Sequence, residues 1–259
     1  MRLWKAEGVA NTRGILFRAP FRVGDCTIFQ KKNSMRIEIK VQKNDKSALE
    51  DIEKLLLKDA ARVCSSLSLA TERYFAFQNF GYIRETTPST KTLAFMQTLG
   101  RVSAKLVVPL KQSSRKNAVT IFELLEKADP YALRAIDYFE KGLTLIRWNE
   151  DAFLNFFKAV ELISNKYFKQ ANPDEIRRIF SKSKKKLTTK DKVLFMCQKL
   201  NIPSKWSSKV ELLVDIRNKQ DVAHAKLRSG QIDEADVHDC RGVARLAIIN
   251  YLKELAGMA

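Results

Sequence analysis

Short apolar stretches with period-two alternation run through the first half of the chain. Residues 35–41 are the clearest, because isoleucine and valine alternate there with charged residues, as expected for a half-buried strand. A helix is expected to begin at Ser47, where Ser47 and Glu50 form the S-x-x-E capping pattern. Further strands are expected at residues 15–17, 26–29, 75–83 and 104–108.

The second half shows only helical spacing of its apolar residues. Asp129 followed by Pro130 marks a helix start, with an N-cap and a proline in the first turn. The expected helices are 130–146, 150–168, 173–180, 190–200 after Thr188 or Thr189, one from Ser207 or Ser208 to Gly230, and 232–255. The prediction is an α+β protein: a mixed α/β domain with short strands over residues 1–128, then an all-α helical bundle over residues 129–259.

The net charge of the chain indicates an anionic partner. The chain has 259 residues, 45% of them hydrophobic, and a net charge of +18, which favours binding of RNA or another nucleic acid. A membrane is the competing partner, but no apolar run reaches the roughly 18 residues that a membrane span needs. Residues 1–17 lack the continuous apolar region of a signal peptide. We therefore expect a cytoplasmic protein that binds no membrane.

Cysteine and histidine positions argue against a metal site. The four cysteines lie far apart in the sequence and show no zinc-binding spacing, so we expect small buried side chains in a reducing compartment. Of the two histidines, His238 stands beside Asp236 and Asp239, which is only a weak indication of metal binding. No glycine-rich phosphate loop occurs either. We expect neither a metal nor a cofactor.

Residues 217–224, with the sequence RNKQDVAH, hold the most promising chemistry. Arg217 offers a planar fork of donors for a phosphate, Asn218 a polar amide, and His224 an imidazole that exchanges protons near neutral pH. In a straight helix Arg217 and His224 point the same way but lie roughly 10 Å apart along the axis. Either the helix is irregular between them, or two chains pair so that Arg217 of one meets His224 of the other.

Other interpretations of the same segment stay open. Arg217 and Asp221 are spaced i,i+4 and would also suit a plain surface ion pair, with His224 on the helix surface. Glu161 falls on the apolar face of the helix expected at 150–168. Its partner is expected to be Arg217 or His224, unless it lies at the edge of the apolar stripe and reaches water.

A lysine-rich segment covers residues 181–192. It serves either as a solvated loop or as a contact for a nucleic-acid backbone. The candidates for binding RNA are Lys182, Lys184, Lys185 and Lys186.

The all-helical second half resembles the HEPN (higher eukaryotes and prokaryotes nucleotide-binding) domain family over residues 129–259. That family's motif is an arginine, usually followed by a polar residue, with a histidine after four to six further positions. Arg217, Asn218 and His224 match it, with six positions between the arginine and the histidine. The stretches DAFLNFFKAVELISN and VELLVDIRN are similar to the helices that precede the motif.

The resemblance implies a metal-independent RNA endonuclease that works as a dimer, in antiviral defence or stress response. Arg217 would bind the scissile phosphate, His224 would transfer the proton, and Asn218 would orient both, with Glu161 and Asp221 in possible supporting roles. The alternatives are a non-catalytic RNA-binding or scaffold protein and a dimerisation module. Lys226 stands where toxin-type members often have a tyrosine, so modification by a nucleotidyltransferase partner is not expected.

Overall fold

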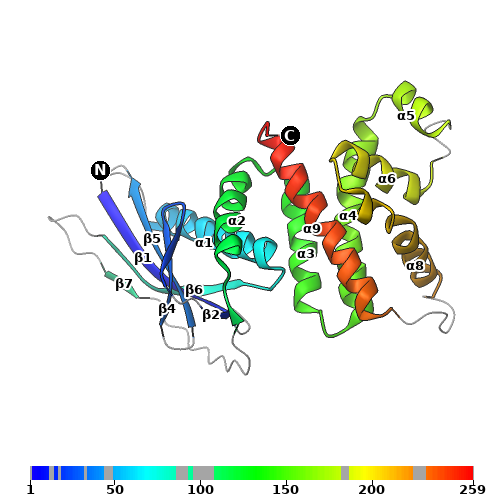
Figure 1. The fold of residues 1–259 in the computed structure, drawn as a ribbon. Helices are drawn as coiled ribbons and strands as arrows, with labels where there is room; N and C mark the ends of the chain where they lie inside the picture. The colour runs from blue at the N-terminus through cyan, green and yellow to red at the C-terminus, as the bar shows by residue number, and fades with distance from the viewer. Residues whose placement is uncertain are drawn as a thin grey trace. The chain divides into compact units, whose positions relative to one another are not determined.

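The computed structural model divides the chain into two compact units, Met1–Glu126 (unit 1) and Lys127–Ala259 (unit 2). It describes residues 2–11, 15–16, 19–31, 34–43, 49–85, 93–95, 108–181, 187–223 and 232–258. Figure 1 shows both strands and helices in unit 1 and helices alone in unit 2. The α+β class is therefore confirmed.

Unit 1 is built on a six-stranded antiparallel sheet in the order β3-β4-β5-β1-β6-β7. A separate parallel pair joins β2 to β8. The strands are β1 (Arg2–Asn11), β2 (Ile15–Leu16), β3 (Phe21–Val23), β4 (Cys26–Lys31), β5 (Ser34–Lys43), β6 (Ala76–Glu85), β7 (Leu93–Phe95) and β8 (Val108–Pro109).

One face of this sheet is covered by helix α1 (Leu49–Thr71). The strands alternate, so every second residue is buried: Trp4, Ala6 and Ala10 of β1, Cys26 and Ile28 of β4, and Met35, Ile37 and Ile39 of β5. Helix α1 supplies the facing layer with Ile52, Leu56, Ala60, Val63 and Leu67. Charged pairs occupy the other face, including Lys5 Nζ with Glu38 Oε2 at 2.5 Å. Helix α2 (Gln112–Leu124) packs against α1 and β3 and ends in a 3₁₀ turn, η1 (Leu125–Lys127).

Unit 2 has a core of three long helices, α3 (Pro130–Thr144), α4 (Asn149–Gln170) and α9 (Glu234–Leu255). Shorter helices pack beside them: α5 (Pro173–Phe180), α6 (Thr189–Lys199), α7 (Ser204–Ser207) and α8 (Val210–Ala223). Aromatic rings fill the centre; those of Phe139 and Phe156 have centroids 5.4 Å apart. No helix among the described residues combines the length and the apolar character that crossing a membrane requires.

Most of the expected elements are present, with some corrections. The strands expected at 26–29, 35–41 and 75–83 correspond to β4, β5 and β6, and the helix starts at Asp129 and Thr188 are confirmed by side-chain caps. Strands β1, β3 and β7 and helix α2 were not expected. The helix placed after Ser207 or Ser208 begins instead at Val210, because α7 occupies Ser204–Ser207.

Candidate functional site

Helix α8 carries Arg217 on the stripe that faces the core of unit 2. Val210, Leu213 and Val214 are all buried. Arg217 follows them at the i+7 position of the same stripe. The geometry of the helix therefore directs its guanidinium inward, toward α4.

The partner of Arg217 on α4 is Glu161. Arg217 Nη2 lies 3.1 Å from Glu161 Oε1, and the two side chains are 26% and 22% exposed. Glu161 follows the buried Phe157 by one helical turn, which brings the carboxylate to the boundary of the apolar core. Glu161 thus pairs with Arg217, one of the two partners expected for it. Such a charge pair holds a guanidinium in a fixed orientation.

Asn218 is the other motif residue that the structure describes. It is exposed, and its Oδ1 lies 3.5 Å from Arg217 Nη1, a distance at which a hydrogen bond is weak. The pair Arg217–Asn218 therefore presents one half-buried cation and one exposed amide at the outer turns of α8.

His224 lies outside the described residues, and so does the side chain of Asp221. Helix α8 itself runs without a break through Ala223.

The lysines expected to bind RNA, Lys182 and Lys184 to Lys186, also lie outside the described residues. The segment that holds them joins α5 to α6. On its N-terminal side, α5 ends at Ser181 in a left-handed conformation, with φ 51°. Arg177 and Arg178 in the last turn of α5 are exposed, so described cations do border the segment.

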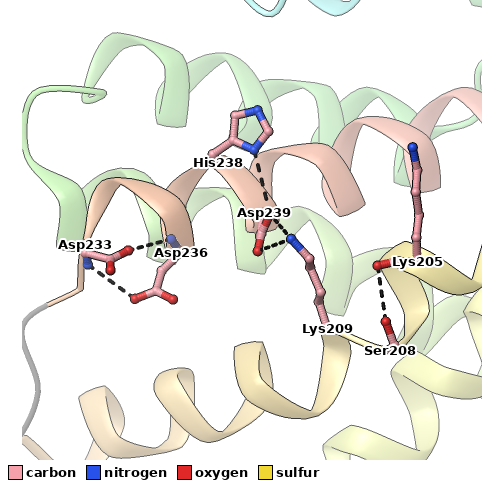
Figure 2. Close-up of polar contacts among 7 residues, drawn as sticks. All are labelled: Lys205, Ser208, Lys209, Asp233, Asp236, His238 and Asp239. Carbon is pink, nitrogen blue, oxygen red and sulfur yellow. Dashed lines mark hydrogen bonds and ion pairs between the residues drawn. The ribbon is translucent and has the colours of Figure 1, made fainter.

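A second polar cluster surrounds His238 at the start of α9 (Figure 2). Lys209, just before α8, reaches across to Asp239 with Nζ 2.5 Å from both carboxylate oxygens. His238 Nδ1 lies 3.7 Å from the same carboxylate, and its ring stacks on Trp206 with centroids 6.4 Å apart. Sequence reasoning missed the roles of Lys209 and Trp206, because only the fold brings α7, α8 and α9 together.

The weak indication of metal binding at His238 finds no support in this cluster. Asp236 accepts a hydrogen bond from the backbone N–H of Asp233 in a capping box, and Asp239 is bound to Lys209. Within the described parts of the chain, no group of three or more His, Cys, Asp or Glu side chains could hold a metal ion. A pocket of about 320 Å³ beside His238 is lined by charges of both signs, from Glu234 and Arg241.

The four cysteines are buried, as expected, and none of them forms a disulfide in the described chain. Burial raises the pKa of the Cys197 thiol to about 12, and burial with the nearby Asp59 and Asp25 raises that of Cys26 to about 12. A thiol with such a pKa carries almost no thiolate at neutral pH. Cys26 and Cys197 therefore serve as buried side chains of the core.

The described site is an arginine anchored by a glutamate on a helical bundle, a few residues ahead of a histidine in the sequence. Such an arginine can bind a phosphate oxygen and stabilise negative charge on it. We compared the chain with models of known protein families, with curated protein sequences and with solved structures, and none of the three comparisons gave a match.

Proposed function

We propose that unit 2 is a metal-independent RNA endonuclease of the HEPN type, acting as a homodimer. The observation that carries the proposal is the contact between Arg217 and Glu161. It fixes Arg217, the first residue of the RNKQDVAH motif, at the edge of the core. An ion pair with a purely structural role on the surface would not need this position.

In the proposed reaction the ribose 2′-hydroxyl attacks the adjacent phosphorus. His224 of one chain takes the proton of that hydroxyl, and Arg217 of the other binds the phosphate oxygens as their charge grows. The bond from phosphorus to the 5′-oxygen breaks, and that oxygen leaves with the proton that His224 took from the 2′-hydroxyl. The products are a 2′,3′-cyclic phosphate and a 5′-hydroxyl end. Glu161 keeps the Arg217 fork oriented, and Asn218 hydrogen-bonds to the substrate.

Cleavage of labelled single-stranded RNA in excess EDTA tests this proposal. Arg217→Ala and His224→Ala are each expected to lower the cleavage rate by about 10²- to 10⁴-fold, because each removes a group acting in the transition state. RNA with a single 2′-deoxy sugar at the cleaved position should be inert, since the nucleophile is missing.

The chain offers matched controls for both variants. His238→Ala removes the only other histidine, and Arg134→Ala removes an exposed arginine of the same unit, on α3. Both should cleave at the rate of the unchanged protein. Unimpaired cleavage by Arg217→Ala and His224→Ala would contradict the proposed chemistry.

The shared site has a test of its own. A mixture of Arg217→Ala and His224→Ala chains is expected to recover part of the activity, because mixed dimers contain one intact site. If activity does not recover in chains that demonstrably exchange subunits, the site is not shared between two chains. A nuclease whose site lies within one chain would then remain.

A non-catalytic RNA-binding protein is the second candidate function. The net charge of +18 favours it, because positive charge suffices to bind the RNA backbone and no catalytic group is needed for that. Binding of RNA without any cleavage in the assay above, with the same affinity in Arg217→Ala and the unchanged protein, would select this function.

A further inference from the structure

Unit 1 contains a basic pocket that belongs to none of the sites described above. Its volume is about 570 Å³, and it opens between β3 and the first two turns of α2. The polar and aromatic lining comes from Phe21 and Arg22 of β3 and from Gln112, Arg115 and Lys116 of α2. On α2 the lining residues recur at helical spacing, so one face of the helix forms the wall.

The charge of this pocket has one sign. Arg22, Arg115 and Lys116 bring three cations to it, and none of the described lining residues is acidic. Across the described chain, no carboxylate lies within salt-bridge distance of these three side chains. Cations gathered without counter-charges repel one another, and an anion in the pocket would relieve that repulsion.

Arg115 is held in an orientation suited to an anion. Its guanidinium lies over the Phe21 ring, 5.1 Å from the centroid. Its Nε is buried and has no hydrogen-bond partner. A buried donor without an acceptor is costly, and a phosphate oxygen is the acceptor that an arginine fork fits best.

The N-terminus of α2 adds to the same effect. Lys111 stands at the N-cap, and its side chain cannot accept hydrogen bonds from the backbone N–H groups of the first turn. No acidic residue lies in that turn. Helix N-termini carry partial positive charge and bind phosphates through these N–H groups. The backbone dipole and the three side chains therefore favour the same kind of ligand.

The walls of the pocket are fixed by packing elsewhere in unit 1. Gly24, at φ +55° in the turn after β3, lies so close to α2 that a Cβ there would approach Phe122 to 2.4 Å. On the other side Arg62 Nη2 donates to the Phe122 carbonyl at 3.0 Å. These contacts hold β3 and α2 in place without help from a ligand, so the pocket is preformed.

A sequence signal for this pocket exists. No acidic residue occurs between Glu85 and Glu123, while six lysines and arginines do. The signal identifies a basic segment. It does not indicate β3 as the other wall, because Phe21 and Arg22 lie about ninety residues before α2 in the sequence.

We propose that this pocket binds a backbone phosphate of a single RNA strand and so captures the substrate of the chain. The choice of RNA, and not of a free nucleotide, rests on the proposed function; the phosphate chemistry does not. Arg115 would grip the phosphate oxygens, Arg22 and Lys116 would neutralise the neighbouring phosphates, and the open shape of the pocket would let the strand continue past it.

The test compares two double variants in full-length Arg217→Ala, a background chosen so that the proposed cleavage does not interfere with the binding measurement. Arg22→Ala with Lys116→Ala removes two exposed cations of the pocket. Lys54→Ala with Lys58→Ala removes two exposed cations of α1 in the same unit and is the matched control. Binding of a labelled 20-nucleotide RNA is measured by fluorescence anisotropy across a salt series, with ATP and inorganic phosphate as competitors.

The pocket double variant is expected to weaken RNA binding roughly tenfold and to flatten the slope of log affinity against log salt by about 1.4, the value for two lost phosphate contacts on a single strand. The control should change the affinity less than about twofold. Equal effects of the two double variants overturn the proposal, and so does the absence of RNA binding. Binding of ATP that depends on the pocket while RNA binding does not also overturns it, in favour of a free nucleotide.

This result is separate from that of the cleavage assay. Pocket-dependent RNA binding by a chain that never cuts RNA would refute the nuclease and leave the pocket standing. Cleavage of RNA by a chain whose RNA affinity does not depend on Arg22 and Lys116 would refute the pocket and leave the nuclease standing.

Discussion

Two glycines on neighbouring strands meet very different surroundings. A Cβ on Gly8 of β1 would lie 2.3 Å from Phe77 Cε2 and 2.9 Å from the Asn79 carbonyl oxygen, whereas one on Gly81 of β6 would meet only the Glu7 carbonyl oxygen at 3.5 Å. We expect Gly8→Ala to lower the free energy of unfolding by about 1–3 kcal/mol, the usual cost of overpacking. Gly81→Ala should leave it unchanged or raise it by up to about 1 kcal/mol. Urea unfolding followed by circular dichroism measures both, and equal losses would contradict the reasoning.

At the same scale, the sequence could predict the partner of Glu161 only as one of two residues. The structure shows Arg217 as a partner, because the helical stripe that runs from Val210 to Arg217 turns Arg217 toward α4. Arg115 shows the limit of such reasoning. Arg115 lies over Phe21 because β3 and α2 pack against each other, and no local sequence pattern predicts that packing.

Elements were predictable where their ends carry side-chain signals. Asp129 caps α3 by accepting from the Ala132 N–H at 2.8 Å, and Thr188 with Asp191 closes a capping box on α6. Strand β1 escaped prediction although it is central in the sheet. Its buried positions are Trp4, Ala6, Gly8 and Ala10, and three of these four are too small to give a hydrophobic alternation. Helix α2 was not predicted because its start lacks a capping side chain.

The junction of α3, α4 and α9 depends on two tyrosines. Tyr167 donates to Glu254 at 2.5 Å and Tyr251 to Asp129 at 2.6 Å, and their rings meet edge to face. Burial, followed by the hydrogen bond to a carboxylate, raises the pKa of each phenol above its usual value. The junction therefore needs both hydroxyls protonated.

Stability should consequently fall at high pH. Above a pH of about 10 the unfolded chain releases these two protons while the folded chain keeps them, so the free energy of unfolding drops by up to about 1.4 kcal/mol per pH unit for each tyrosine. Urea unfolding between pH 9 and pH 11.5 measures the slope. Tyr167→Phe and Tyr251→Phe should each flatten it, whereas Tyr138→Phe, on α3 but outside the junction, should not. A slope that none of these variants changes would exclude the junction as its origin.

For the whole molecule, the two units differ in what they can contribute. Unit 1 buries its own sheet-and-helix core, and unit 2 buries a separate core of aromatic and aliphatic side chains. The positive charge of the chain is present in both halves. The proposed chemistry belongs to unit 2 and the proposed capture of RNA to unit 1, so the two activities should be separable.

Expressing residues 127–259 alone tests this division. We expect a folded helical fragment, because the buried side chains of α3, α4 and α9 pack on one another within the unit. It should cut saturating RNA at about the rate of the full chain, yet bind RNA more weakly and with a shallower salt slope, because the cations of the α2 pocket are gone. Residues 1–126 alone should bind RNA without cutting it. Circular dichroism, the EDTA cleavage assay and salt-dependent anisotropy provide the three measurements. A folded 127–259 fragment with undiminished RNA affinity would place substrate capture in unit 2 together with the chemistry.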